Sequence, residues 1–289
     1  MTLRCLTIAT SDSGGGAGIQ ADLKAFAQAG CHGLSALVAL TAQNTVGVSA
    51  IQELPPEFVT AQLEALFDDI GVDAAKTGML YSRRLIECVA DFLAQHPVPL
   101  VVDPVMVASS GARLLAEDAV ETLVERLFPL ARVVTPNLAE AQLLAGVPEE
   151  TDKGELAERI HHRGARAVIV TGGHGSPVDH LFDGSEHLAI PIERLEVAAT
   201  HGAGCTHSAA LCAALARGQS LRAAATTAAL TATEAVAHGL SDLGAGEGPV
   251  DVLHLRRVTP LASGLPSPER RRARLSAAAP STPPPEEPA

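Results

Sequence analysis

Four segments of this chain place glycines, carboxylates or a cysteine directly after short apolar runs of the kind that form β-strands. They are ATSDSGGGAGIQAD (9–22), VVDPVMVASSG (101–111), TPNLAEAQLLAG (135–146) and ATHGAGCTHSAALCAALARG (199–218). In an open parallel sheet, ligands bind in the crevice beyond the carboxyl ends of the strands. We therefore expect the chemistry of this chain in these four loops.

The first loop has three consecutive glycines, and the residues that follow it have a helical period. Glycines let backbone N–H groups approach a ligand closely, and the start of a helix adds partial positive charge. The spacing matches neither the P-loop, GxxxxGK followed by Ser or Thr, nor the dinucleotide-binding GxGxxG. A ligand-binding loop and a plain strand-to-helix turn fit this spacing equally well.

The second and third loops supply oxygen ligands. Asp103 directly follows a buried-looking strand, and Asn137 and Glu140 would share one face in the first turn of a helix. Carboxylate and amide oxygens are suitable groups for a site in which Mg²⁺ is coordinated together with phosphates. An Asp satisfied by backbone donors and an ordinary helix cap would give the same pattern.

The fourth loop is a glycine-rich turn, His201–Cys205, followed by a run of small residues that predicts a tightly packed helix. The backbone N–H groups of Ala203, Gly204 and Cys205 could converge there as an anion hole. A helix N-terminus lowers the pKa of a thiol, so we expect an accessible thiolate at Cys205. The alternative is a small buried hydrophobic residue. All the histidines, His201 and His207 included, are interpreted as surface or packing residues.

Strand-like runs alternate with helical patterns along the chain, which predicts βαβ units and a mostly parallel sheet with helices on both faces. Apolar residues recur with helical period at 85, 86, 89, 92 and 93 and again at 120, 123, 124, 127 and 128. The predicted strands are Leu6–Ala9, Leu34–Leu40, Ala74–Thr77, Leu100–Val102, Val133–Thr135 and Ala167–Val170.

Composition narrows the classes of function. The net charge of −12 argues against nucleic acid or an anionic membrane as the main partner. The five cysteines are widely spaced and form no CxxC, which disfavours a zinc site or a disulfide framework. The N-terminus lacks a signal peptide pattern, and the apolar stretch 221–239 contains Glu234 and His238, so we expect a cytoplasmic protein. Residues 1–258 are predicted to form one domain and residues 259–289, rich in Pro, Ser and Ala, a disordered tail.

Taken together, these loops resemble the ribokinase superfamily, and within it the hydroxymethylpyrimidine/phosphomethylpyrimidine kinases of thiamin biosynthesis. The resemblance extends in colinear order from about residue 6 to about residue 255 and predicts a ribokinase-like α/β fold. Its pieces are SDSGGGAGIQADLKAF, TAQNTVGV, KTGML, DPVMVASSG, TPNLAEAQLL, GGHG, HGAGCTHSAALCAAL and GEGPVDVLHL. The first piece and the HGAGC segment are the most specific.

The resemblance implies ATP-dependent phosphorylation of 4-amino-5-hydroxymethyl-2-methylpyrimidine and of its monophosphate, with Mg²⁺ as cofactor and a homodimer as the assembly. Gln43 should hydrogen-bond the aminopyrimidine ring, because an amide offers both a donor and an acceptor. The other residues expected in the substrate pocket are Asp12, Ala17, Thr41, Met79 and Val105.

The resemblance also implies roles on the phosphate side of the site. Asp103 and Glu140 should act through Mg²⁺, and Asn137, Thr171 and the backbone of Ala203 should contact ATP. Gly202, Gly204 and Cys205 should form the anion hole, with Cys205 where most of the superfamily has an Asp base.

Three positions depart from the family pattern. Thr10 stands where a Gly is usual beside the substrate, which narrows the pocket; Ser109 and Thr171 stand where Lys is common. Losing two phosphate contacts would weaken nucleotide binding or the second phosphorylation.

Three alternatives stay open at this stage. A Cys at position 205 also occurs in some pyridoxal kinases, so a pyridoxal kinase is the closest alternative. A non-catalytic pyrimidine sensor is disfavoured by the intact Asp103, Glu140 and HGAGC set. An NAD-dependent dehydrogenase is disfavoured because no GxGxxG follows the first strand.

Overall fold

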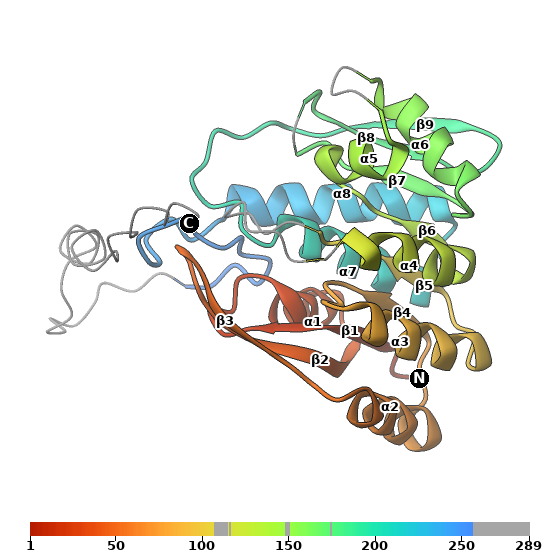
Figure 1. Ribbon diagram of the computed structural model, residues 1–289. Coiled ribbons are helices and arrows are strands. Elements are labelled where there is room, and N and C mark those ends of the chain that lie inside the picture. Colours follow the sequence, from red (N-terminus) through yellow and green to blue (C-terminus); the bar gives the residue numbers. More distant parts are fainter. Residues whose placement is uncertain (107–114, 116, 148–150, 174, 257–289) are drawn as a thin grey trace, which may run out of the picture.

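The computed structural model describes residues 1–106, 115, 117–147, 151–173 and 175–256. Ser109, the GGHG histidine and the predicted tail 259–289 lie outside these residues. The strands are β1 (Arg4–Asp12), β2 (His32–Asn44), β3 (Gly47–Glu53), β4 (Ala74–Thr77), β5 (Leu100–Val102), β6 (Val133–Val134), β7 (Val168–Val170), β8 (Val178–Phe182) and β9 (His187–Pro191). All nine form one sheet in the order β3-β2-β1-β4-β5-β6-β7-β8-β9 (Figure 1).

The six central strands are parallel, and all six were predicted. Strands β1, β4, β5, β6 and β7 are almost completely buried, which explains their unbroken apolar sequences. The predicted mostly parallel sheet with helices on both faces is therefore confirmed.

The three unpredicted strands, β3, β8 and β9, pair antiparallel at the two edges of the sheet. β3 and β9 are mainly exposed or half-exposed, so their sequences lack a long apolar run. β3 returns against β2 as a hairpin, and this arrangement holds Gln43 near the turn at the carboxyl end of β2.

Helices cover both faces of the sheet (Figure 1). α1, α7 and α8 pack on one face, in a core cluster dominated by alanines and three cysteines; the remaining α-helices pack on the other, in a larger cluster of Leu, Val, Ile and Phe. The α-helices are α1 (Gly18–Gln28), α2 (Pro56–Ala65), α3 (Arg83–Gln95), α4 (Glu117–Leu127), α5 (Leu138–Ala145), α6 (Lys153–His162), α7 (Ala203–Ala216) and α8 (Leu221–Ala237). A π-helical turn (Leu66–Ile70) follows α2, and a 3₁₀ turn (Phe128–Leu130) follows α4.

The small residues of α7 explain how the fold positions the fourth loop. Nine consecutive residues of this helix, Thr206–Ala214, are buried, and they include Ala209, Ala210, Ala213 and Ala214. Side chains this small let the helix lie close to the sheet and to α8, which brings the N-terminus of α7 to the carboxyl ends of the strands. Among the described residues, no helix is long and apolar enough to cross a membrane.

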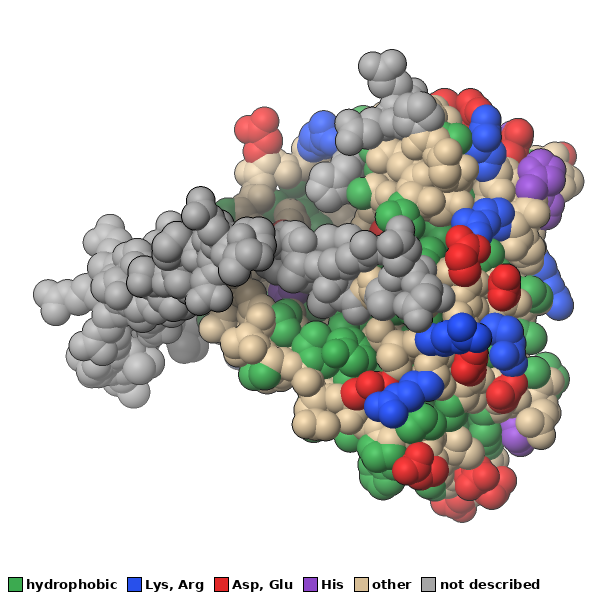
Figure 2. All heavy atoms as spheres, viewed as in Figure 1, with side chains coloured by type: hydrophobic (Ala, Val, Ile, Leu, Met, Phe, Trp, Pro, Cys, Tyr) green, Lys and Arg blue, Asp and Glu red, His purple; other side chains and the backbone are tan. Residues whose placement is uncertain are grey.

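On the face drawn in Figure 2, Lys and Arg side chains lie among Asp and Glu side chains instead of gathering into one basic patch. The surface also carries exposed ion pairs such as Arg159–Glu155 (2.7 Å). Such exposed pairs each add little to stability, so the fold depends on the two apolar clusters.

Candidate active site

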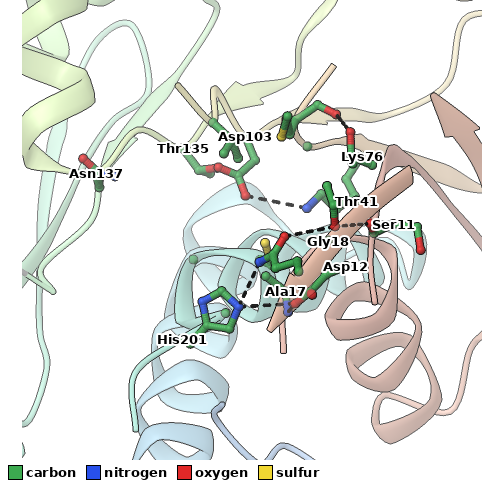
Figure 3. Close-up of a pocket in the computed structure, with 18 of the residues that line it drawn as sticks. Ser11, Asp12, Ala17, Gly18, Thr41, Lys76, Asp103, Thr135, Asn137 and His201 are labelled. Atoms are coloured by element: carbon green, nitrogen blue, oxygen red, sulfur yellow. Dashed lines mark hydrogen bonds and ion pairs between the residues drawn. The ribbon is translucent and has the colours of Figure 1, made fainter. Parts of the chain in front are cut away.

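A pocket of about 180 Å³ opens at the carboxyl ends of the parallel strands (Figure 3). Every residue predicted for the site except Ala203 lines it. The full lining is Thr10, Ser11, Asp12, Ala17, Gly18, Thr41, Gln43, Lys76, Gly78, Met79, Asp103, Val105, Thr135, Asn137, Glu140, Thr171, His201, Gly202, Gly204 and Cys205. Residues from all four loops thus meet in one cavity, although their individual roles stay predictions.

Asp12 organises the glycine loop. Its Oδ1 accepts a hydrogen bond from the N–H of Gly14 (2.8 Å), and its Oδ2 accepts from Gly16 (3.0 Å) and Ala17 (2.8 Å). Burial alone would raise the pKa of Asp12, but His201 and these backbone donors lower it below its ordinary value. These N–H groups already have an acceptor, so the loop offers a ligand fewer free donors than its glycines suggest.

One glycine lets this loop pack against the start of α7, and another lets it pack against the end of β1. Gly202 has φ +85, and a Cβ there would collide with the carbonyl oxygen of Gly16. Gly18 has φ +56, and a Cβ there would collide with the carbonyl oxygen of Thr10. Positive φ and a missing side chain are both required, so the predicted anion hole and the glycine loop form one packed unit.

The part of the wall beside the glycine loop carries groups suited to a polar ring. Thr41 donates to the carbonyl oxygen of Ser11 (2.9 Å) and to Oε1 of Gln43 (3.1 Å), and Nε2 of Gln43 lies 3.5 Å from Nε2 of His201. His201 also lies 3.3 Å from Oδ2 of Asp12 (Figure 3). The interpretation of His201 as a surface or packing residue is wrong, because it lines the pocket and contacts two predicted site residues. Its position in the sequence, beside the glycines of the fourth loop, could have identified it as a residue of the site.

Lys76 is the second residue that sequence reasoning missed. Its side chain is fully buried, with Nζ 2.9 Å from Oδ1 of Asp22 and 3.6 Å from Oδ2 of Asp103. Burial alone would lower the pKa of Lys76, but the two carboxylates raise it above its ordinary value. Thr7 donates to Asp22 (2.6 Å) and Ser208 to Asp103 (2.8 Å), which completes the network. The ammonium group therefore stays charged beneath the pocket.

Asn137 and Glu140 are both a helix cap and a part of the pocket. Asn137 Oδ1 accepts from the N–H of Glu140 (3.0 Å), and Glu140 Oε2 accepts from the N–H of Asn137 (3.0 Å), the reciprocal bonds of a capping box. Glu140 Oε1 lies 3.3 Å from the N–H of Met106. The interpretation of this pair as a helix cap is therefore confirmed, and both residues also line the pocket, where their functional role stays a prediction.

The neighbouring carboxyl groups of Asp103 and Glu140 make the pocket favourable for a cation. Burial and then the charge of Asp103 raise the pKa of Glu140 to about 8. Among the described residues no group of three His, Cys, Asp or Glu side chains could hold a metal ion. Mg²⁺ typically takes one or two carboxylates together with water and substrate phosphates. Asp103 and Glu140 fit that pattern of ligands.

The N-terminus of α7 supplies backbone donors. The N–H groups of Gly204 and Cys205 have no backbone acceptor among the described residues, as expected in a helix's first turn. The N–H of Ala203, in contrast, donates to the carbonyl oxygen of Thr200 (3.1 Å), and Ala203 does not line the pocket. This donor is already engaged in the turn before the helix, and the predicted contact of the Ala203 backbone with ATP stays a prediction.

Cys205 differs from expectation in its protonation. Burial and the charges of Asp22 and Asp103 raise its pKa to about 12, although Lys76 and the N–H of Gly18 act in the other direction. The prediction of a lowered pKa from the helix N-terminus is wrong. A thiol whose pKa is raised to about 12 is neutral at pH 7.

Comparison with known proteins agrees with this geometry. The phosphomethylpyrimidine kinase family profile matches residues 12–251. The chain belongs to this family. It is 48% identical over 262 residues to a hydroxymethylpyrimidine/phosphomethylpyrimidine kinase from Rhizobium meliloti (strain 1021), covering 88% of this chain and 98% of the relative.

Solved structures support the same family and its ribokinase-like fold. A Bacillus subtilis pyridoxal kinase in complex with ADP is 38% identical with a TM-score of 0.79, covering 87% of this chain and 97% of that one. A phosphomethylpyrimidine kinase from Clostridium difficile 630 is 38% identical with a TM-score of 0.73, covering 81% of this chain and 100% of that one. The predicted family and fold are thus confirmed, and the chain is a phosphotransferase of this family.

The buried network makes a prediction about stability. Lys76→Met would leave Asp22 charged and unpaired in the core, which typically costs about 3–5 kcal/mol. Urea unfolding should show this loss, and the double variant Lys76→Met/Asp22→Asn should recover part of it. Arg4→Met, which breaks an ion pair of similar length (2.8 Å) at the surface, is the control and should have a much smaller effect. An equal loss in the two single variants would contradict a special role for the buried pair.

The raised pKa makes a prediction about the reactivity of Cys205. Only the thiolate reacts with iodoacetamide, so alkylation of the free enzyme should quicken by about tenfold per pH unit from pH 7 to 10. Mass spectrometry of the peptide that contains Cys205 measures the rate. The half-exposed Cys88 gives an internal reference. A plateau in the rate below pH 8 would mean that the helix N-terminus outweighs burial.

Proposed function

We propose that this chain transfers the γ-phosphoryl group of ATP to the hydroxymethyl group of 4-amino-5-hydroxymethyl-2-methylpyrimidine, and then phosphorylates the monophosphate, in thiamin diphosphate biosynthesis. One observation carries the proposal beyond the family match. A single pocket holds a polar ring-binding wall, a carboxylate pair and a helix N-terminus with free N–H groups.

The wall formed by Thr41, Gln43 and His201 would bind the pyrimidine. The Thr41 hydroxyl already orients the Gln43 amide, so little side-chain freedom is lost when a ring binds. Ala17, Met79 and Val105 line the pocket beside these polar groups and would contact the ring's apolar surface. Asp12 would act on the substrate indirectly, because its oxygens hold the glycine loop and face His201.

Asp103 and Glu140 would hold Mg²⁺, which neutralises charge on the phosphates when bound. Asn137 and Thr171, on the same side of the pocket, would lie along the nucleotide. Charge on the transferring phosphoryl group would be stabilised by the N–H groups of Gly204 and Cys205, with Gly202 giving the turn that aims them.

Because the thiol of Cys205 is neutral, we attribute most of the catalysis to positioning of the substrates and to these backbone donors. Phosphoryl transfer passes through a loose transition state, so little proton transfer is needed at the barrier. Cys205 would accept the substrate's proton only in a site whose ligands lower its pKa. The family analogy adds a homodimer as the proposed assembly.

Pyridoxal kinase is the second candidate, because a pyridoxal kinase of known structure is 38% identical to this chain. Both rings are heteroaromatic and carry a hydroxymethyl group. Thr10 favours the pyrimidine: it lines the pocket, it is 4% exposed, and its hydroxyl donates to the carbonyl oxygen of Met79 (3.0 Å). A β-branched side chain fixed in this way leaves less room for a more substituted ring.

The two candidates are separated by offering both alcohols to the purified protein with Mg·ATP. We expect kcat/KM for the pyrimidine to exceed that for pyridoxal by at least about tenfold. Mass spectrometry of the products distinguishes the monophosphate from the diphosphate. A preference for pyridoxal would overturn the proposal, and a reaction that ends at the monophosphate would restrict it to the first step.

Gln43 provides the test of the substrate wall. Gln43→Ala should leave the polar edge of the ring without its partner, at a cost of roughly 1–3 kcal/mol, so KM for the pyrimidine should rise several-fold or more. KM for ATP should stay within about twofold of the parent, since Gln43 lies on the substrate side. Thr171→Ala, on the nucleotide side, is the reciprocal control. Equal changes in both KM values would remove Gln43 from the pyrimidine pocket.

A further inference from the structure

A buried histidine, His207, lies near the N-terminus of α7, close in sequence to the predicted anion hole. His207 follows Cys205 by two residues on α7, and its side chain is only 5% exposed. Its Nε2 lies 3.0 Å from Oδ2 of Asp179, whose side chain is 3% exposed. Neither ring nitrogen makes a well-aligned hydrogen bond to any described residue, so this short approach to the Asp179 carboxylate is the polar contact of the ring.

Asp179 joins this histidine to the nucleotide side of the pocket. It is the second residue of β8, and its Oδ1 accepts a hydrogen bond from the N–H of Gly172 (2.6 Å). Thr171, the preceding residue, lines the pocket and donates its own N–H to the carbonyl oxygen of Pro136 (3.0 Å). The 171–172 segment is thus held from one side by the loop that begins α5 and from the other by Asp179.

Close packing makes this segment sensitive to movement. A Cβ at Gly172 would lie 2.7 Å from the carbonyl carbon of Val178 and from Cδ1 of Ile192. The segment therefore has no free space on that side, and its position depends on the bonds that hold it. Because the oxygens of Asp179 bind Gly172 and face His207, a shift of this carboxylate would move Thr171.

His207 is one of the groups that lower the pKa of Asp179. Burial alone would raise the pKa of Asp179, but His207, the N–H of Gly172 and Lys153 together hold it below its ordinary value. Nζ of Lys153 donates hydrogen bonds to the carbonyl oxygens of Ser176 (2.8 Å) and Val178 (2.9 Å). Its charge therefore acts on Asp179 from a distance, and His207 is the side chain in direct contact.

We propose that His207 and Asp179 form a positioning pair, which sets the place of Thr171 relative to the N-terminus of α7 and so tunes the affinity for the nucleotide. Neither residue is among those that line the pocket. The inference rests on the proposed function only in placing the nucleotide beside Thr171.

Three variants test the pair. His207→Leu fills the space but leaves Asp179 without its partner; His207→Gln retains a donor of similar reach. His161→Leu is the matched control, because His161 on α6 also has a buried, unpartnered ring nitrogen and packs edge-on against Phe182 (5.2 Å). The readouts are the Kd of the ATP analogue AMP-PCP with Mg²⁺, measured by calorimetry, and the separate KM values for ATP and the pyrimidine.

We expect His207→Leu to weaken AMP-PCP binding and to raise KM for ATP by about tenfold, with KM for the pyrimidine within about twofold of the parent. His207→Gln should restore binding to within about threefold, and His161→Leu should change neither KM. Unchanged AMP-PCP binding in folded His207→Leu, an equal rise in both KM values, or no rescue by Gln would each overturn the inference.

Two further points keep the test decisive. If His207→Leu does not fold, Asp179→Asn replaces it, because the loss of charge on the other member should give the same selective effect on the nucleotide. If the parent phosphorylates neither alcohol, the proposed function fails. The AMP-PCP comparison still tests the pair, since it needs no phosphoryl acceptor.

Discussion

The buried ammonium group of Lys76 joins the elements that carry the site. It extends from β4, contacts Asp22 on α1 and approaches Asp103 at the end of β5, with Cys205 at the start of α7 also within its field. Removing charges from water is costly, and the cost is offset only where partners are close and well bonded. The glycine loop's helix, the Asp103 loop and the anion hole are thus held together by one buried cation, which supports the floor of the pocket.

The same network leaves the pocket short of positive charge. Lys76 faces Asp22 as well as Asp103, so it balances only part of the negative charge that Asp103 and Glu140 add near the opening. The raised pKa values of Glu140 and Cys205 have this common origin, burial beside Asp103. A divalent cation with its phosphates would relieve both effects, which supports the proposal that Asp103 and Glu140 hold Mg²⁺ together with ATP.

Sequence reasoning found the parts of the fold whose signals are local. Buried parallel strands have unbroken apolar runs, and glycines or carboxylates after them marked the four loops that meet in the pocket. The edge strands β3 and β9 were missed because exposed antiparallel strands need no such run. Nothing local marks Lys76, since its importance comes from Asp22, fifty-four positions away, and Asp103.

Three predictions did not take competing protein groups into account. The roles of Asp12, Ala203 and Cys205 were predicted from what their groups can offer a ligand, whereas the structure shows that other protein groups already engage or surround them. Of these predictions, the low pKa of Cys205 is wrong. Asp12 absorbs the donors of the glycine loop, Thr200 takes the N–H of Ala203, and burial outweighs the helix N-terminus at Cys205. Such competition depends on three-dimensional neighbours, which spacing along the chain does not show.

This competition also determines how the pocket would select its substrate. With the glycine loop's N–H groups engaged by Asp12, the proposed recognition of the ring would depend on side chains, chiefly Thr41, Gln43 and His201. Their contacts with one another fix one wall, while the hydrogen bond from Thr10 to Met79 fixes a second place on the lining. A pyridoxal ring carries four substituents and the hydroxymethylpyrimidine three, so a cavity whose walls are fixed excludes the larger ring more strongly than a flexible one would. Selectivity would then follow from walls fixed before the ligand arrives rather than from any single contact with it.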